Sequence, residues 1–153
     1  MNDKTFRYDA CGLDNVEITG LEFVVDDDGE ECIRIPRVNE LHKLLARMIV
    51  RRAKGMSGKE LRFLRTEMGM TQAELAKIVT RDVQSIGRWE RGEIPIDPNA
   101  ELIIRLLASE RLELHIEENV ETMSSWCVSP AGPQPLIVDA SDPCEYKPLP
   151  VAA

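Results

Sequence analysis

The apolar residues in the middle of the chain recur every three or four positions, which is the spacing of amphipathic helices. The first such stripe predicts a helix that begins near residue 38 with Asn39 as its N-cap. The segment 51–55, basic residues followed by glycine, marks its end. The apolar members of this stripe are Val38, Leu41, Leu45, Met48 and Ile49.

Four short helices are predicted after it, because capping signals mark their ends. Ser57 with Glu60, and Thr71 with Glu74, have the spacing of capping boxes, in which a hydroxyl and a carboxylate each accept a hydrogen bond from a backbone N–H group. The remaining signals are Gly69, Asp82, Gly92 and the pair Asp97-Pro98. The expected helices are 58–68, 72–79, 83–91 and 98–110.

The first 36 residues have strand and turn character instead. The segments 17–25 (EITGLEFVV) and 31–36 (ECIRIP) flank an acidic turn, which predicts a β-hairpin with Gly29 at a positive φ. The run Asp26-Asp27-Asp28 also resembles the start of a calcium loop. Position 37, where such a loop needs its distal glutamate, is Arg, so we expect a turn and no calcium site.

The pattern weakens after residue 111. Leu112, Ile116, Val120 and Met123 keep a four-residue spacing, which fits either an extension of the last helix or a separate one. Residues 127–153 contain six of the nine prolines. Because proline disfavours helices and central strands, we expect a polyproline-like or disordered tail there.

Composition narrows the class of protein. The chain is 43% hydrophobic and 30% charged, which is ordinary for a folded protein of one or two small domains. It has no apolar run of about 18 residues and no signal-peptide pattern, so we expect a cytoplasmic protein without a membrane span. We find no catalytic motif, and we expect neither an enzyme nor a cofactor.

The cysteines and histidines do not have the spacing of a metal site. Zinc sites need ligands in close pairs, and no such pair occurs here. We expect four reduced thiols, no bound metal, and two histidines that are satisfied or exposed. The residues concerned are Cys11, Cys32, Cys127, Cys144, His42 and His115.

Charge is distributed unevenly. The net charge is −8, yet residues 51–111 carry +3 while residues 1–50 carry −5 and residues 112–153 carry −6. A mildly basic centre between acidic ends fits a DNA-binding core with other attachments.

Residues 72–91 (QAELAKIVTRDVQSIGRWER) carry the functional pattern. They predict two short helices joined by a tight turn, with apolar residues facing inward and a narrow, convex outer face suited to the DNA major groove. The inward residues are Leu75, Ala76, Val79, Ile86 and Trp89. The outward residues are Val83, Gln84, Ser85, Gly87, Arg88 and Arg91.

These residues, within RFLRTEMGMTQAELAKIV…SIGRWERG, resemble the helix-turn-helix of the lambda-repressor-like (Cro/repressor, XRE-type) superfamily over residues 58–108. The resemblance implies that Gln72 contacts a DNA phosphate and that Arg65 and Glu90 form a structural ion pair. It also implies that the bases are read by Val83, Gln84, Ser85 and Arg88. Glutamine suits adenine and arginine suits guanine. Further candidates for phosphate contacts are Lys59, Arg62, Lys77 and Arg91.

Two positions depart from the superfamily pattern. Thr80 stands where glycine is usual, and Arg81 where a buried aliphatic residue is usual. Either the turn is reshaped, or Thr80 is strained at positive φ and the stem of Arg81 lies over the core.

The N-terminal part has a weaker resemblance. YDACGLDNVEITG, followed by a hairpin, a helix and SGKELRFLR, is similar to the N-terminal arrangement of MqsA-like antitoxins and regulators. Members of that group bind zinc through two CxxC pairs. Only Cys11 and Cys32 are present in this region, so the metal site is not carried over. Whether this part of the chain binds a toxin is an open question at this point.

We therefore predict a mainly α protein with a helix-turn-helix domain, a small N-terminal α+β extension and a disordered Pro-rich tail. The expected divisions are a hairpin-helix domain at 5–54, the DNA-binding domain at 55–111, a dimerisation helix or arm at 112–126 and the tail at 127–153. We expect a DNA-binding repressor or antitoxin that binds a palindromic operator as a homodimer. The candidates for its dimer contact are Leu107, Leu112, Leu114 and Ile116. The alternative is a protein-interaction adaptor, or a toxin-neutralising partner, with little DNA binding.

Overall fold

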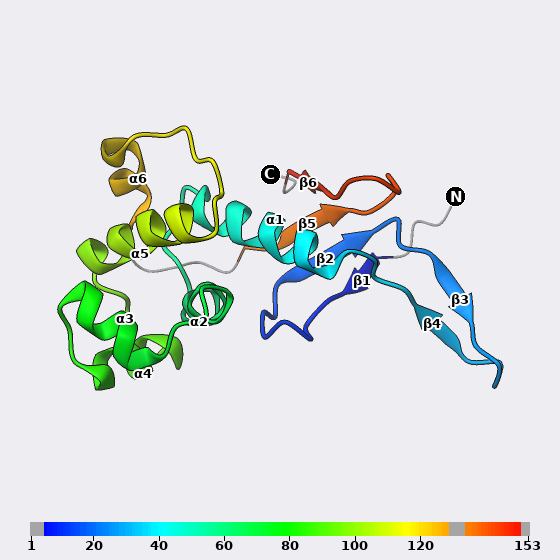
Figure 1. The fold of residues 1–153 in the computed structure, drawn as a ribbon, viewed down its shortest axis with the longest axis horizontal. Coiled ribbons are helices and arrows are strands. Elements are labelled where there is room, and N and C mark those ends of the chain that lie inside the picture. The colour runs from blue at the N-terminus through cyan, green and yellow to red at the C-terminus, as the bar shows by residue number, and fades with distance from the viewer. Residues whose placement is uncertain (1–4, 129–133, 151–153) are drawn as a thin grey trace.

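The computed structural model describes residues 5–128 and 134–150, which form a helical part and a β part (Figure 1). The strands are β1 Thr5–Arg7, β2 Val16–Thr19, β3 Phe23–Val25, β4 Glu31–Ile33, β5 Leu136–Asp139 and β6 Lys147–Leu149. The helices are α1 Val38–Val50, α2 Gly58–Glu67, α3 Gln72–Val79, α4 Val83–Glu90, α5 Pro98–Arg111 and α6 Val120–Trp126. The fold is mainly α with a small β extension, as the sequence predicts. No helix in the described ranges is long and apolar enough to cross a membrane.

Helices α2 to α5 confirm the four predicted helices to within a residue or two. Ser57 and Thr71 both close complete capping boxes, with Glu60 and Glu74 as the reciprocal acceptors. In α4 and α5 the caps are single aspartates. Capping signals in this part of the chain are local, so they mark the helix ends wherever the helices later pack.

The start of α1 differs from the prediction. Its N-cap is Arg37, in the left-handed conformation at φ 49°, and Asn39 lies inside the helix. The Arg37 guanidinium donates to Glu40 at 2.7 Å and to the backbone carbonyls of Pro143 and Cys144 at 3.0 and 2.5 Å. Asn39 as N-cap is therefore wrong, because contacts with a segment more than 100 residues away fix Arg37 instead.

The predicted hairpin is confirmed, but it is shorter than the apolar pattern suggested. Strands β3 and β4 pair antiparallel around a turn with Gly29 at φ 83°, and the Asp26 carboxylate accepts the N–H groups of Asp28 and Glu30. Segment 17–25 is divided at Gly20, whose φ is 77°. A Cβ there would lie 2.7 Å from the Ser141 nitrogen, so glycine allows the C-terminal segment to pass closely.

The prediction of a disordered Pro-rich tail is wrong. Strand β5 pairs in parallel with β2, Ile18 opposite Val138, and β6 pairs antiparallel with β5. The sheet order is β1-β2-β5-β6, so β5 is central. The prolines do not prevent this because β5 itself has none and Pro148 lies in the edge strand β6, where fewer ladder hydrogen bonds are needed. Pro130 and Pro133 lie outside the described residues.

The stripe from Leu112 to Met123 does not extend α5. Helix α5 ends at Arg111, residues 113 and 115 have positive φ, and α6 begins after Asn119, whose side chain accepts the Thr122 N–H at 2.8 Å. Helix α6 packs back against α5. The separate helix is therefore the correct alternative.

Helix α1 connects the two parts, and Figure 1 shows it running from the sheet to the helical bundle. Leu41, Leu45 and Ile49 on one face are buried in a single hydrophobic core that also contains Ile18 and Val138 of the sheet.

The described cysteines form no disulfide, and Cys127 is buried, which raises the pKa of its thiol to about 12.

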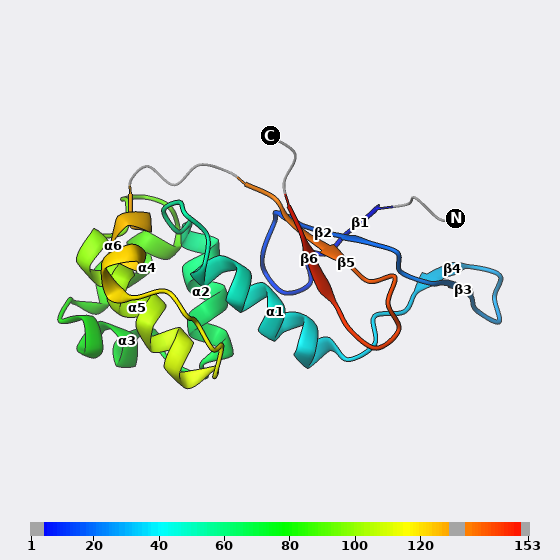
Figure 2. The ribbon, with the colours of Figure 1, turned by 90° about the horizontal axis from the view of Figure 1, so that it is seen from above.

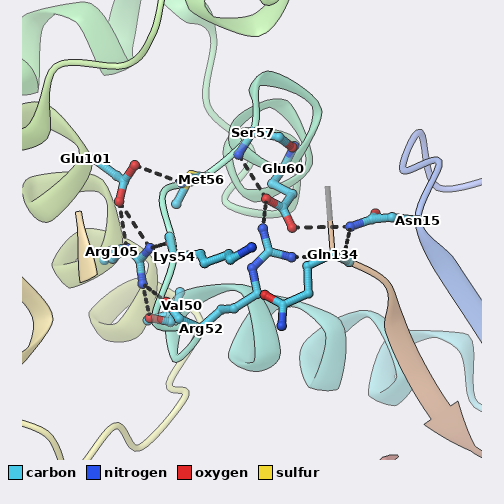
Figure 3. A network of polar contacts seen from close by, with 10 residues as sticks. All are labelled: Asn15, Val50, Arg52, Lys54, Met56, Ser57, Glu60, Glu101, Arg105 and Gln134. Carbon is cyan, nitrogen blue, oxygen red and sulfur yellow. Dashed lines mark hydrogen bonds and ion pairs between the residues drawn. The ribbon is translucent and has the colours of Figure 1, made fainter. Parts of the chain in front are cut away.

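A buried polar network reinforces this connection (Figure 3). The Glu60 side chain is fully buried. Its carboxylate accepts the Ser57 N–H at 2.9 Å, Arg52 at 2.5 Å and the Asn15 amide at 3.5 Å. Arg52 also donates to the Gln134 carbonyl at 3.2 Å. One carboxylate thus links α2, the end of α1, the β1–β2 loop and the segment leading to β5.

Arg105 forms the second half of the network. It is fully buried in α5 and donates to the carbonyls of Val50, Arg52 and Lys54 at 2.8, 2.9 and 2.5 Å. It also donates to Glu101 at 3.2 Å. Helix α1 ends in this region, where carbonyls lack helical partners, and the guanidinium satisfies them.

Candidate nucleic-acid interface

The turn between α3 and α4 is tight, with residues 80–82 joining the two helices. Thr80 is the C-cap of α3 and adopts φ 57° and ψ 49°, so the threonine takes the left-handed conformation. Arg81 does not cover the core: its side chain is 48% exposed and pairs with Asp97 at 3.1 Å. Of the two alternatives, the strained Thr80 is found, whereas Arg81 bridges to the start of α5.

Helix α4 begins at a conventional cap. The Asp82 carboxylate accepts the Ser85 N–H at 2.8 Å, and hydrogen bonds from Ser85 lower the pKa of Asp82. The carboxylate therefore stays ionised at neutral pH. A charged cap at this position stabilises the first turn of α4.

The two faces of α4 differ sharply in exposure. Ile86 and Trp89 are buried, at 0% and 4% exposed, and pack into the core of the domain. Gln84 and Arg88 are exposed, and Val83 is 45% exposed. Ser85 is half-buried beside its cap. Three of the four predicted base-reading residues are therefore exposed on α4, and Trp89 is a core anchor.

The back of α4 is held by close packing against α2. A Cβ at Gly58 would lie 2.2 Å from the Trp89 carbonyl oxygen, so only glycine lets α2 approach this closely. Arg65 of α2 donates to both carboxylate oxygens of Glu90, at 2.6 and 3.0 Å, and to the Met70 carbonyl at 2.8 Å. This ion pair fixes α4 on the domain.

Gln72 joins the same arrangement. Its side-chain amide donates to Glu90 at 3.0 Å, and the residue is half-buried at the N-terminus of α3. Its predicted role is a phosphate contact. The structure places it beside α4, with its amide donor engaged within the chain.

The four cationic candidates for phosphate contacts fall into two groups. Lys59 pairs with Asp14 at 2.9 Å and Arg91 with Glu93 at 3.0 Å, and these cations lower the pKa of Asp14 and Glu93. Arg62 and Lys77 are exposed, and neither forms an ion pair with any described residue. Only the second pair is free of a competing carboxylate.

The dimer candidates are placed differently from one another. Leu114 is 2% exposed within the chain, so it is not available for a dimer contact, and that prediction is wrong. It turns inward because the positive φ values of Glu113 and His115 fold the chain back after α5. Leu107, Leu112 and Ile116 are partly buried against the core.

Sequence reasoning missed the residues that hold the helical domain on the sheet. Glu60 appears in the sequence only as a capping residue, and its contacts with Arg52 and Asn15 arise from distant segments. His42 is satisfied, as expected: its ring nitrogens contact Tyr8 Oη at 2.7 Å and Glu67 at 2.6 Å. No local signal identifies these partners.

A short helix with a buried back, a polar outer face and a tight turn before it defines a helix-turn-helix DNA-binding domain. The family comparison gives the same assignment. Residues 61–109 match the helix-turn-helix family model, so the chain contains a lambda-repressor-like, XRE-type domain of the kind found in DNA-binding regulators. No curated protein and no solved structure matches the chain, and the comparisons give the MqsA-like resemblance no support.

Proposed function

We propose that this protein is a transcriptional repressor that binds a palindromic operator as a homodimer and regulates its own operon. The observation that carries the proposal is the outward placement of Gln84 and Arg88 on a helix whose opposite face is buried. An exposed recognition helix can enter the major groove without any rearrangement of the domain.

Base reading is assigned to the outer face of α4. The Arg88 guanidinium is suited to the O6 and N7 atoms of guanine, and the Gln84 amide to N6 and N7 of adenine. Val83 offers an apolar contact for a thymine methyl group. The unpaired cations Arg62 and Lys77 supply phosphate contacts, which position the helix without reading sequence.

Dimerisation follows from the limited reach of one recognition helix, because two-fold symmetry doubles the length of the site. Helix α5 offers a surface for it: Ile103 and Leu106 are 38% and 36% exposed, and the partly buried Leu107 lies beside them. We assign the dimer contact to this face of α5, and Leu112 and Ile116 extend it.

We further propose that the protein acts as an antitoxin. The β3–β4 ribbon projects from the body at the end opposite α4 (Figures 1 and 2), and its Val24 and Val25 are 41% and 70% exposed. A two-stranded ribbon is only marginally stable alone, which favours a protein partner there. Co-purification with the product of a neighbouring gene tests this role, and purification of the chain without any partner contradicts it.

A gel-shift titration against the DNA upstream of the chain's own gene tests DNA binding. We expect a specific shift that weakens steeply with salt and needs about 10- to 100-fold more protein in Arg88→Ala and in Gln84→Ala. Arg34→Ala is the matched control, because Arg34 is exposed but follows β4, away from α4.

Analytical ultracentrifugation of Leu106→Glu tests the dimer contact on α5. We expect this variant to be monomeric.

The alternative function is a protein-interaction adaptor that keeps the fold and lacks DNA affinity. The net charge of −8 favours it, since an acidic protein repels phosphates. The same titration separates the two functions: an adaptor gives no specific shift at any salt concentration.

A further inference from the structure

The β3–β4 ribbon extends away from the rest of the molecule. Its two strands pair with each other as a separate sheet, and no other described strand joins them. Both ribbon views show it projecting with no helix over it (Figures 1 and 2). Ile33, near its base, packs against the hydrophobic core, whereas residues 24–30 are all exposed. We call residues 24–30 the ribbon tip.

Two adjacent apolar side chains are exposed on the ribbon tip. Val24 and Val25 are 41% and 70% exposed, and they point to opposite faces because successive residues of a strand alternate. Scattered exposed valines are ordinary on protein surfaces. Here, however, a two-stranded ribbon has no core of its own, so a further element that covers these valines would stabilise it. The ribbon tip is therefore suited to docking.

The ribbon is also strongly acidic. Residues 22–31 contain six carboxylates and no lysine or arginine. Asp27, Asp28 and Glu30 are exposed, and none of them forms an ion pair with a described residue. Asp26 has a structural role, because its carboxylate accepts two N–H groups of the turn and the Cys32 thiol. The six carboxylates belong to Glu22, Asp26, Asp27, Asp28, Glu30 and Glu31.

Charge selects among the molecules that could cover the ribbon tip. The ribbon of a second copy and nucleic acid are both anionic, so they would be repelled. No group of acidic, cysteine or histidine side chains within residues 5–128 and 134–150 is arranged to hold a metal ion. A cationic protein surface has the complementary charge, and the net charge of −8 would also attract it at long range.

We propose that the ribbon tip docks against a basic segment of a partner protein, in which lysine or arginine side chains flank a short apolar stretch. The cations would pair with Asp27, Asp28 and Glu30. The apolar stretch would cover Val25, which directly precedes the acidic turn. This inference deepens the proposed antitoxin function, and it rests on that function for the existence of a partner.

The position of the ribbon tip separates this contact from DNA binding. The ribbon and α4 lie at opposite ends of the molecule (Figures 1 and 2). A partner on the ribbon tip and an operator on α4 would therefore not compete for the same surface of one chain.

Fluorescence anisotropy of a labelled peptide, titrated with the full chain at low ionic strength, tests the proposal. The peptide has a Val-Ile-Val centre with lysines on both sides. We expect saturable binding at one site per chain that weakens as salt is added. Binding should be at least about tenfold weaker when glutamates replace the lysines, and when serines replace the apolar centre. No saturable binding of the first peptide would overturn the proposal, as would equal affinity for the serine peptide.

Matched charge variants locate the contact. The combined substitutions Asp27→Asn, Asp28→Asn and Glu30→Gln remove three charges and leave Asp26 to hold the turn. We expect at least about tenfold weaker peptide binding. A control that removes three other exposed carboxylates should keep the affinity within about twofold, and equal loss in both variants would overturn this location. The control combines Glu113→Gln, Glu117→Gln and Glu121→Gln, in α6 and the segment before it.

A second pair of variants tests the apolar part of the contact. Val25→Ser removes the most exposed valine of the ribbon tip and should weaken peptide binding by about three- to tenfold. Val120→Ser is the control, because Val120 is 52% exposed at the start of α6, and it should leave the affinity unchanged. Unchanged affinity in Val25→Ser would overturn the assignment of the apolar stretch to this residue.

The peptide titration uses neither DNA nor the product of a neighbouring gene. Absence of peptide binding therefore overturns the basic-partner inference, whereas peptide binding without co-purification of the neighbouring product contradicts the antitoxin role. Sedimentation velocity of the chain alone, at the same ionic strength, tests the remaining occupant. Self-association that disappears in the triple ribbon variant would assign the ribbon tip to a second copy and overturn the proposal.

Discussion

The helical domain and the sheet are built by different kinds of contact. In α2 to α5, each helix end is set by residues within four positions of it, such as Ser57 with Glu60 and Thr71 with Glu74. In the sheet, β2 pairs with β5 across about 120 residues of chain, Ile18 opposite Val138. The DNA-binding half is therefore specified locally, while the β half depends on the return of the C-terminal segment.

Substitution at the junction between the two regions should destabilise the fold most. Arg105→Met removes the cation that satisfies three carbonyls near the end of α1, and it leaves the buried Glu101 carboxylate with the Met56 N–H but without its cationic partner. We expect a loss of about 3–5 kcal/mol in the free energy of unfolding, measured by urea denaturation. Arg111→Met, in the same helix but exposed, is the control and should change stability by less than about 0.5 kcal/mol. A loss of similar size in both variants would contradict the role of the junction.

The central place of β5 gives the next largest effect. Leu136 is 2% exposed, and we expect Leu136→Ala to destabilise the fold by about 2–5 kcal/mol in the same denaturation experiment. Leu149→Ala in the edge strand is the matched control, because Leu149 is 37% exposed and should cost much less. A disordered tail would make both substitutions silent.

The same contrast explains why the helical domain could be predicted well from the sequence and the sheet poorly. The helices α2 to α5 and the outward face of α4 follow from caps and apolar spacing, so Gln84 and Arg88 could be placed without a structure. Strand β5 carries no such signal, since it is only four residues long (LIVD), has three apolar residues followed by Asp139, and stands among prolines. Its partner β2 and the Glu60–Arg52 contact are selected by tertiary packing, which single-sequence patterns do not encode.

Substitutions on the exposed face of the recognition helix should change DNA affinity without changing stability. We expect Arg88→Ala to reduce operator affinity by about 10- to 100-fold, which corresponds to about 1–3 kcal/mol for one base contact. Because the Arg88 side chain is exposed and forms no ion pair with a described residue, the unfolding midpoint should not change. Lys77→Ala should weaken binding to all sequences alike and lower the salt slope by about 1, as expected for one phosphate contact. Sequence-dependent loss in Lys77→Ala would contradict this division.

Substitution in the turn before α4 should change the free energy of unfolding least. Thr80 adopts φ 57°, which costs a residue with a Cβ about 1–2 kcal/mol. Glycine removes this strain but loses more chain entropy on folding, about 0.5–1 kcal/mol. Thr80→Gly should therefore stabilise the domain by up to about 1 kcal/mol, whereas Thr66→Gly, inside α2, should destabilise it by a few tenths of a kcal/mol. Urea denaturation of both variants measures the difference, and a destabilised Thr80→Gly would show that the threonine contributes packing that outweighs its backbone strain.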